Sequence, residues 1–289
     1  MLEKIENFSK LYPFQSNFLD LDGLNYHYVH EGKGNDETVI MLHGNPTWSF
    51  YYRNLAFAFK DRYQVLVPDH IGCGFSDKPE SYEYTLENHI ENVLKLIKFH
   101  DVKNFHLIVH DWGGAIGFGV ASKLKDQVKS ITILNTAAFK SDFIPARIGL
   151  CKNKLFGEFL VRALNGFAWP ATFMTTVRPL PKYVKKAYLA PYNNYKNRKA
   201  ISEFVKDIPM DRAHRSYGTL DKIENDLKNI DCPKLILWGG QDFCFNDRFF
   251  NKWREIYPDA SYKYYQDAGH YVLEDKREEV IQEIAKFIG

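Results

Sequence analysis

The chain has 289 residues, of which 45% are hydrophobic and 26% are charged, and its formal net charge is +2 at pH 7. These values are ordinary for a globular protein. The lysines lie among acids, so we expect neither a nucleic-acid-binding face nor a polybasic membrane patch.

Targeting and redox features point to a cytoplasmic protein. The first residues carry acids where a signal peptide would need an apolar core, and no apolar run approaches the roughly 20 residues of a transmembrane helix. The four cysteines are dispersed and form no CxxC motif. We therefore expect reduced thiols and no metal site.

The first half of the chain alternates between strand and helix patterns. Asp22-Gly23 lies between the first two apolar runs and predicts an antiparallel hairpin. Short apolar runs predict strands at 18–21, 26–30, 39–42, 63–67, 105–109 and 128–134. Helical spacing of apolar residues predicts helices at 50–59, at 85–99 with Thr85 as N-cap, and after Gly113-Gly114. This alternation indicates an α/β fold, a mostly parallel sheet flanked by helices on both faces.

Residues 107–114 contain the most informative turn. The strand at 105–109 passes through Asp111 into a helix that opens with two glycines. So sharp a strand-to-helix turn lifts its central side chain above the sheet edge, with the first amides of the helix directed at it. The serine version of this turn is the nucleophile elbow. An Asp that caps a helix is the commoner arrangement, so the stretch alone leaves nucleophile and cap both open.

The pattern changes after Thr136. No strong strand follows until residue 234, and the aromatic, helix-compatible pieces between are broken by prolines. We predict a helical cap domain at 139–228, inserted into a core domain formed by 1–138 and 229–289. Strands at 234–238 and 262–265 and helices at about 247–256 and 278–287 complete the core. Eight apolar cap residues are candidates to line a pocket or to form cap core, and the sequence does not sort them: Phe143, Phe156, Phe159, Leu164, Phe167, Trp169, Phe173 and Phe204.

Two further residues at predicted strand ends complete a catalytic set. Asp242 follows the strand at 234–238 and His270 follows the strand at 262–265, so the chain order is nucleophile, acid, histidine. Ionised Asp111 can attack an sp³ carbon and form a covalent ester. His270 can take a proton from the water that hydrolyses this ester, and Asp242 would orient the imidazole. The pair favours the nucleophile interpretation of Asp111.

Asn45 and Trp112 are candidates for anion binding. Their backbone N–H groups would form an oxyanion hole, and their side-chain N–H groups could point into the pocket towards a departing anion such as halide. The plain alternative is that Asn45 serves the turn before Pro46 and Trp112 is core packing. We prefer the functional interpretation, because both residues adjoin the attacking oxygen.

With these residues laid out, the sequence resembles the haloalkane dehalogenase family of α/β-hydrolases over nearly its whole length. The resemblance implies the α/β-hydrolase fold, a nucleophile at Asp111, a base at His270, a halide-binding pair at Asn45 and Trp112, and no cofactor. Residues 135–137 carry no carboxylate, so Asp242 matches the triad acid, as in the third dehalogenase subfamily. The matching segments are His-Gly-Asn-Pro-Thr-Trp-Ser-Phe-Tyr-Tyr-Arg (43–53), Pro-Asp-His-Ile-Gly-Cys-Gly-Phe-Ser-Asp-Lys-Pro (68–79), Val-His-Asp-Trp-Gly-Gly (109–114) and Asp-Ala-Gly-His-Tyr-Val-Leu-Glu-Asp (267–275).

The function that this resemblance implies is cleavage of a carbon–halogen bond in a small apolar substrate, giving an alcohol and a halide ion. The same segments are similar to the β-lactone decarboxylases of bacterial long-chain olefin synthesis, which convert a cis-β-lactone into a cis-alkene and CO2. The active-site residues do not separate these two activities. Whether the chain forms a homo-oligomer or joins other olefin-pathway enzymes stays open.

Three other interpretations are less favoured. Epoxide hydrolases share the Asp/His/Asp set but need two cap tyrosines, for which the candidates are Tyr183, Tyr188, Tyr192 and Tyr195. Coelenterazine luciferases share the fold but call for Glu after the strand that ends at Leu134. A binding-only protein would be expected to have lost part of the triad, which is intact here.

Overall fold

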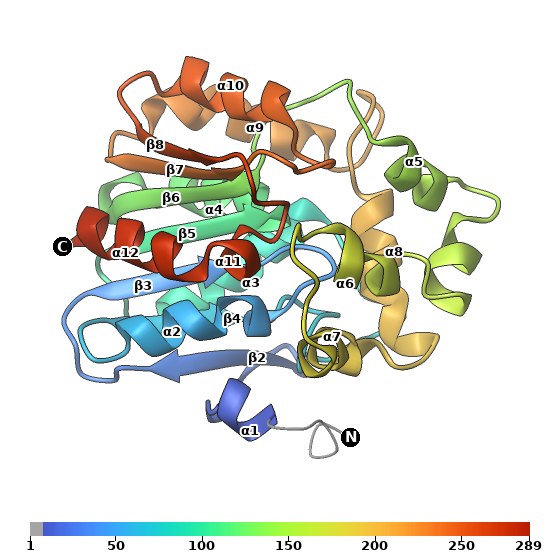
Figure 1. The fold of residues 1–289 in the computed structure, drawn as a ribbon, viewed down its shortest axis with the longest axis horizontal. Coiled ribbons are helices and arrows are strands. Elements are labelled where there is room, and N and C mark those ends of the chain that lie inside the picture. The colour runs from blue at the N-terminus through green and yellow to red at the C-terminus, as the bar shows by residue number, and fades with distance from the viewer. Residues whose placement is uncertain (1–7) are drawn as a thin grey trace.

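The computed structural model describes residues 8–289, and its centre is an eight-stranded sheet (Figure 1). The strand order is β1-β2-β4-β3-β5-β6-β7-β8. β2 pairs antiparallel with β1 and with β4, and every other neighbouring pair is parallel. The predicted hairpin and the mostly parallel sheet are therefore confirmed. The strands are β1 (Ser16–Leu21), β2 (Leu24–Glu31), β3 (Thr38–Leu42), β4 (Gln64–Pro68), β5 (Phe105–Asp111), β6 (Val128–Thr136), β7 (Lys234–Gly239) and β8 (Ser261–Tyr265).

Helices bury both faces of this sheet. Side chains alternate along a strand, so in β3 Ile40 and Leu42 join one core while Val39 and Met41 join the other. The first core is completed by α3 (Leu86–Phe99), α4 (Trp112–Lys123), α9 (Tyr217–Asp226) and α10 (Asp247–Ile256). The second is completed by α2 (Arg53–Phe59), α11 (Val272–Asp275) and α12 (Arg277–Ile288). Burial on both faces explains why the central strands are continuous apolar runs.

The predicted helices differ from the structure mainly at their ends. Thr85 does cap α3, because its hydroxyl accepts the Asn88 N–H at 3.3 Å. The segment predicted as one helix at 50–59 is a 3-10 turn at Ser49–Tyr52 followed by α2. Two short helices were not predicted, α1 (Phe8–Leu11) and α11.

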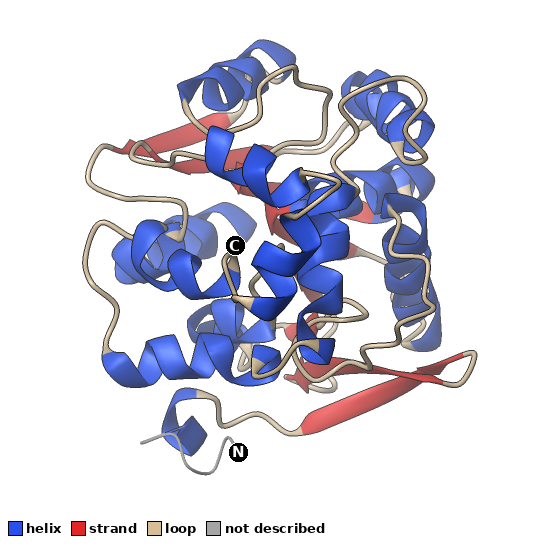
Figure 2. Ribbon diagram, turned by 90° about the vertical axis from the view of Figure 1, so that its right-hand side faces the viewer, coloured by secondary structure: helices blue, strands red, loops and turns tan. Residues whose placement is uncertain are grey.

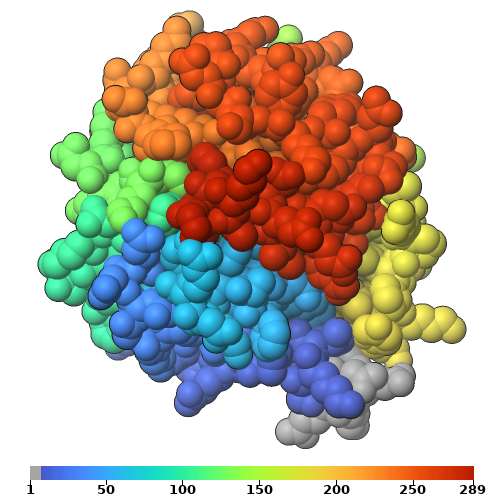
Figure 3. Space-filling view, turned by 60° about the vertical axis from the view of Figure 1, so that its left-hand side comes forward, coloured from blue at the N-terminus to red at the C-terminus, as the bar shows by residue number. Residues whose placement is uncertain are grey.

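The C-terminal helix lies against the N-terminal half of the core. α12 packs beside α2, and Figure 3 shows this C-terminal segment next to the N-terminal part of the chain. The Tyr63 hydroxyl at the start of β4 donates to a carboxyl-terminal oxygen of Gly289 at 2.6 Å. The C-terminal end of the last helix is thus held beside the start of β4.

Between β6 and β7 the described chain contains helices and no strand. They are α5 (Ala146–Lys152), α6 (Ala168–Met174), α7 (Lys182–Leu189), α8 (Lys199–Lys206) and α9, with a π-helical turn at Phe159–Ala163. α5 to α8 lie beyond the carboxyl ends of the parallel strands, at the right of Figure 1, and face the viewer in Figure 2. α9 instead packs on α3 and α4. The division into a cap at 139–228 and a core stays a prediction.

Candidate active site

Asp111 is the last residue of β5 and adopts a backbone conformation that residues with a side chain rarely take. Its φ is 51° and its ψ is −127°. Such a left-handed residue other than glycine costs free energy and persists only where the surrounding structure holds it. This conformation places the Asp111 carboxylate above the sheet edge, where only 13% of the side chain is exposed.

Glycines on both sides of Asp111 make this turn sterically feasible. A Cβ added to Gly44 would lie 2.0 Å from Asp111 Oδ1, and a Cβ added to Gly113 would lie 1.9 Å from the Leu42 carbonyl oxygen. A Cβ on Gly114 would meet the Thr136 hydroxyl at 1.9 Å. The helix α4 therefore starts directly against β3 and β6, and its first N–H groups reach the carboxylate.

The two oxygens of Asp111 have different surroundings. Oδ1 accepts the Asn45 N–H at 2.6 Å, and the Trp112 N–H also hydrogen-bonds the carboxylate. Oδ2 lies 3.7 Å from His270 Nε2, which is beyond hydrogen-bond range. The Asn45 amide, which was predicted as part of an oxyanion hole, thus holds the first oxygen, whereas the second oxygen makes no hydrogen bond to His270.

His270 is oriented by Asp242. His270 Nδ1 and Asp242 Oδ2 are 2.7 Å apart, so Nδ1–H donates to the carboxylate and Nε2 is directed at Asp111. Burial lowers the pKa of His270, but the charges of Asp242 and Asp111 and the hydrogen bond to Asp242 together raise it above the usual range. Burial raises the pKa of Asp111, although His270 and the two amides oppose this shift. The structure therefore brings together all three residues that the sequence grouped.

Asn135 supports the acid, a role that the sequence analysis missed. Its Nδ2 donates to Asp242 Oδ2 and to the Gly239 carbonyl, both at 3.0 Å, and its Oδ1 accepts the Gly239 N–H at 2.8 Å. The Cys244 N–H donates to the other oxygen of Asp242 at 2.6 Å. A buried amide at the end of an apolar strand was the available signal, but its partner on β7 is 104 residues away in sequence.

Two more missed residues hold the backbone around His270. His110 Nε2 donates to the His270 carbonyl at 2.9 Å. Asp275 accepts the Gly269 N–H at 2.8 Å and the Val177 N–H at 2.9 Å, so it joins the histidine loop to the chain that leaves α6. Asp275 lies inside the 267–275 segment that resembles the dehalogenases, and that resemblance was the available signal.

The side chains of Asn45 and Trp112 both line the space above Asp111. One N–H of the Asn45 amide donates to the Ile201 carbonyl of α8 at 3.1 Å. Asn45 Oδ1 has no partner within the described part of the chain. The Trp112 ring packs against Phe204, with ring centroids 5.4 Å apart. Their anion-binding role stays a prediction.

Two apolar cavities meet at Asp111. Their volumes are about 900 and 1140 Å³, counting space that is open to solvent. Both are lined by Asn45, Asp111, Ile148, Phe167 and Cys244. We refer to them as the first and the second cavity.

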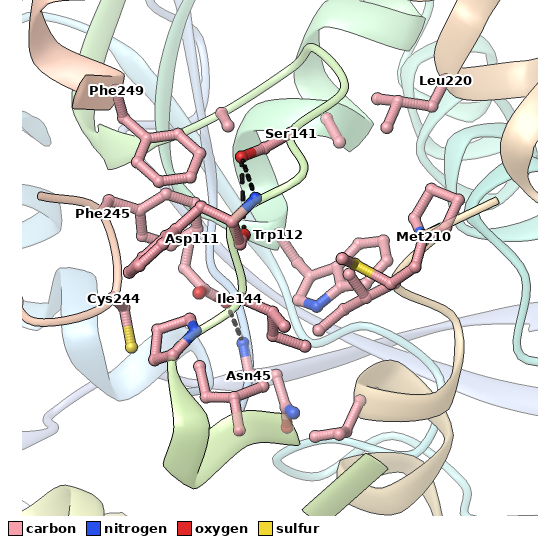
Figure 4. A pocket seen from close by; sticks show the side chains of 18 of the residues that line it. Asn45, Asp111, Trp112, Ser141, Ile144, Met210, Leu220, Cys244, Phe245 and Phe249 are labelled. Atoms are coloured by element: carbon pink, nitrogen blue, oxygen red, sulfur yellow. Dashed lines mark hydrogen bonds between the residues drawn. The ribbon is translucent and has the colours of Figure 1, made fainter. Parts of the chain in front are cut away.

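The first cavity runs along the sheet towards α9 and α10. Figure 4 shows Asp111 between an aromatic wall, with Phe245 and Phe249, and an aliphatic wall with Met210 and Leu220. The second cavity runs between α5 and α6 and includes His270 and Trp169. An apolar molecule with two arms therefore fits with its centre beside the carboxylate.

The eight candidate cap residues separate into distinct groups. Phe143 lines the first cavity, Phe167 lines both, and Leu164 and Trp169 line the second. Phe204 is buried against Trp112. The three remaining residues line neither cavity and are at least 43% exposed: Phe156, Phe159 and Phe173.

The cap tyrosines are turned away from Asp111. Tyr188 donates to Glu274, and Tyr192 donates to the Thr47 carbonyl at 3.1 Å. No tyrosine of residues 8–289 lines either cavity. The tyrosine pair that epoxide opening needs is therefore absent from the described site.

Comparisons with known proteins place the chain among α/β-hydrolases. A family described as "alpha/beta hydrolase fold" matches residues 37–277. A cis-3-alkyl-4-alkyloxetan-2-one decarboxylase of Shewanella oneidensis is 46% identical over 286 residues, which cover 96% of this chain and 89% of that protein. A decarboxylase of the same name from Xanthomonas campestris is 38% identical over 290 residues, which cover 96% of this chain and 97% of that protein.

Haloalkane dehalogenases are also similar. Haloalkane dehalogenase 2 of Mycobacterium tuberculosis is 26% identical over 295 residues, 97% of each chain. The crystal structure of a mutant haloalkane dehalogenase from Agrobacterium tumefaciens superimposes with a TM-score of 0.86 at 26% identity, covering 96% of this chain and 98% of that one. The predicted resemblance and fold class are confirmed.

The prediction that the chain itself is a haloalkane dehalogenase is wrong. Nearly full-length identity is 46% and 38% to the two decarboxylases and 26% to the dehalogenases just described. The error has a physical cause, because the segments around Asp111, Asp242 and His270 resemble both groups and do not separate them. The distinction depends on the cap, where the sequence pattern did not separate pocket residues from exposed ones.

Proposed function

The chain belongs to the α/β-hydrolase fold family and is an enzyme of that superfamily, and from this premise we propose that it is a β-lactone decarboxylase. Its substrate would be a cis-3-alkyl-4-alkyloxetan-2-one, a four-membered lactone with an alkyl chain on each of two adjacent carbons. The products would be a cis-alkene and CO2. The names of the two relatives with 46% and 38% identity support this assignment.

The observation that carries the proposal is the pair of apolar cavities that meet at Asp111. A lactone with two alkyl chains needs one apolar space for each chain and a reactive group at their junction. The first cavity would take one chain and the second cavity the other, which sets the lactone ring beside the carboxylate. A substrate with a single chain would fill only one of them.

The first chemical step is ring opening by Asp111. Oδ2 attacks C4, the sp³ carbon that carries the ring oxygen, and a new Oδ2–C4 bond forms with inversion. The C4–O bond breaks, and its electron pair stays on the former ring oxygen as part of a free carboxylate. Relief of ring strain favours this opening. Asn45 and Trp112 line the cavity at this point, and their side-chain N–H groups would bind the departing carboxylate.

The second step returns Asp111 to its starting form. The bond between C3 and the carboxylate breaks and releases CO2, while its electron pair becomes the C3=C4 double bond. The C4–Oδ2 bond breaks at the same time, and its pair returns to Asp111. Anti-periplanar loss after inversion at C4 converts a cis-lactone into a cis-alkene. The negative charge moves from the substrate carboxylate to Asp111, where the Asn45 N–H is in place to receive it, and the escape of CO2 makes the step hard to reverse.

His270 would assist the departure of Asp111. Its raised pKa favours the imidazolium form, and Nε2 lies 3.7 Å from Oδ2 in the free site. A small approach would let Nε2–H donate to Oδ2 as negative charge returns to it. Asp242 stabilises the cation, and neither step consumes water or a net proton.

The test is product analysis with purified protein and synthetic cis- and trans-dialkyl β-lactones. We expect the cis-lactone to give the cis-alkene and one CO2 for each lactone consumed. Replacing Asp111 with Asn removes the nucleophilic carboxylate and should lower turnover at least about 10³-fold. The wild-type protein would fail the proposal if it released a β-hydroxy acid instead of alkene, or if it left the lactone intact.

A further inference from the structure

The cap carries an unusual concentration of exposed apolar side chains. Thirteen large hydrophobic residues of 8–289 are exposed, and eight of them fall between residues 150 and 177. Seven of these define what we term the apolar face: Leu150, Leu155, Phe156, Phe159, Leu164, Trp169 and Phe173. Leu155 is 94% exposed. Single exposed hydrophobic residues are ordinary, but a group of this size indicates a surface that something covers.

Contacts connect most members of the apolar face. Leu150, Leu164 and Trp169 line one cavity, and the Trp169 and Phe173 rings are 4.9 Å apart. Phe156 and Phe159 belong to the helical turns that lead to Leu164, because the Leu164 N–H donates to the Phe159 carbonyl at 3.3 Å. These segments belong to the side of the molecule that Figure 2 turns to the viewer.

The apolar face is continuous with the second cavity. Leu150, Leu164 and Trp169 are each at least 50% exposed and also line that cavity, which ends at Asp111 and His270. An apolar molecule can therefore pass from the surface to the nucleophile along apolar side chains. The surface and the cavity form one path.

The charge of this region differs from that of the whole chain. Residues 146–178 contain five basic residues and one acid, a net charge of +4, whereas the whole chain has +2. The single acid, Glu158, is neutralised by Arg162 and Lys206 at 2.6 Å each. Arg147 and Lys154 are exposed, and Arg147 lines the second cavity. Arg162 is buried and paired with Glu80 and Glu158, whereas Arg147 and Lys154 form no ion pair among the described residues. These two exposed cations beside the apolar face match an anionic surface.

We propose that the apolar face docks on an anionic lipid surface, so that the second cavity opens towards the lipid. Aromatic and aliphatic side chains that insert at the headgroup boundary, with cations beside them, are the composition that interfacial binding requires. The docking is inferred from the apolar face and the charge beside it alone. Uptake of the lactone and release of the alkene along the second cavity rest on the proposed function.

Sedimentation with vesicles tests the docking without any substrate. The full chain is mixed with vesicles of phosphatidylethanolamine and phosphatidylglycerol, or of phosphatidylcholine alone. We expect binding to the anionic vesicles, weakened as salt is raised. Replacing Leu155 and Phe159 with Ser should lower the bound-to-free ratio at least about tenfold, because two inserted side chains are lost.

The matched control changes exposed rings elsewhere. Phe57 and Phe99 are 56% and 58% exposed, close to the 60% of Phe159, and they belong to α2 and α3. Their double replacement by Ser should leave vesicle binding unchanged. Leu155 and Phe159 line neither cavity, so their variant should still act normally on a short-chain lactone dissolved in detergent.

Tryptophan fluorescence reports on the same event directly. Trp48, Trp238 and Trp253 are fully buried, whereas Trp169 is 57% exposed. Anionic vesicles should shift the emission to the blue, and replacing Trp169 with Phe should remove the shift.

Two results would overturn the inference. One is the absence of binding to either vesicle by a protein that is active on the detergent-dispersed lactone. The other is a dimer in sedimentation velocity that the Leu155/Phe159 variant abolishes, since a second copy would then cover the face. Vesicle binding with no lactone turnover would keep the docking and overturn the proposed function instead.

Discussion

At the scale of single residues, the site depends on how each polar group is held. Asp111 Oδ1 accepts the Asn45 N–H, so we expect the oxygen that faces His270 to be the attacking one. A serine in this position has one oxygen and could not fill both positions. The carboxylate is therefore oriented before substrate binds.

The role of the triad acid should be transferable from residue 242 to residue 135. Asn135 Nδ2 and His270 Nδ1 both contact Asp242 Oδ2, at 3.0 and 2.7 Å. Replacing Asp242 with Asn should lower the turnover number about 10²–10³-fold, because the imidazolium loses its partner charge. Adding Asn135→Asp should restore part of that loss. Steady-state kinetics on the cis-lactone provides the measurement, and a double variant no faster than the single one would show that Asn135 cannot reach His270.

The pH profile should reflect the raised pKa values of both Asp111 and His270. Activity requires ionised Asp111, so it should fall in acid at a higher pH than the ordinary aspartate value of about 3.9 would give. The proposed role of His270 requires the cation, so activity should also fall as pH rises through its raised pKa. A histidine that activates water as a base would give the opposite trend on the alkaline side.

Stability should follow the same titration. The folded pKa of His270 lies above the value of about 6.5 for an unfolded histidine. The charged ring therefore makes its full contribution to the free energy of unfolding below the unfolded pKa of about 6.5. This contribution is lost as pH rises through the folded pKa. In denaturant unfolding, the stability advantage of the wild type over His270→Gln should shrink across that range. A constant difference would contradict the assignment.

At the scale of elements, the elbow depends on close approach between α4 and β3. Replacing Gly113 with Ala would drive a Cβ to within 1.9 Å of the Leu42 carbonyl, and backbone atoms cannot move aside easily. We expect a loss of at least about 3 kcal/mol in unfolding free energy. Gly218 in α9 is the matched control, because a Cβ there meets nothing within 4 Å. Its replacement by Ala should be neutral or stabilise by up to about 1 kcal/mol.

The strands and the elbow were predictable because their signals are local. β5 is an apolar run that ends in a turn, and Gly113 and Gly114 mark the place where α4 meets the sheet. The role of Asn135 was not predictable, since it depends on where β7 lies. Asp111, Asp242 and His270 were found because each follows a strand of one parallel sheet, whose carboxyl ends lie along one edge.

The cap was less predictable, because helical spacing shows which residues share a face but not what covers that face. Phe143 and Phe159 both occur in aromatic, helix-compatible stretches. In the structure Phe143 lines the first cavity, and Phe159 is 60% exposed. The same limit explains the wrong choice of activity, since the active-site residues alone did not separate the two activities.

At the scale of the whole molecule, the two cavities should discriminate between the two chains of the lactone. Ala137 lines only the first cavity and Ala171 only the second. Replacing either with Phe should lower kcat/KM for a lactone with two long chains about tenfold or more, because a filled cavity excludes its chain.

Lactones with one long and one short chain separate the two variants. Each variant should prefer a different one of the two positional isomers, whereas the wild type should accept both. Melting temperatures control for misfolding. Identical preferences in the two variants would contradict a separate cavity for each chain.

No helix within the described residues is long and apolar enough to cross a membrane. The apolar face around the second cavity is the part of the described molecule that combines exposed rings, cations and a path to Asp111. The second cavity thus connects the apolar face to Asp111.

The central claim is that Asp111 forms an ester which collapses to alkene and CO2 without water. The most direct test is repeated turnover of the cis-lactone in water enriched in oxygen-18, followed by mass spectrometry of the Asp111 peptide. We expect abundant cis-alkene and an unlabelled Asp111, because both oxygens of the carboxylate are retained in every cycle. Incorporation of oxygen-18 into Asp111 in step with turnover would show that water hydrolyses the ester, and it would rule out direct collapse to alkene and CO2.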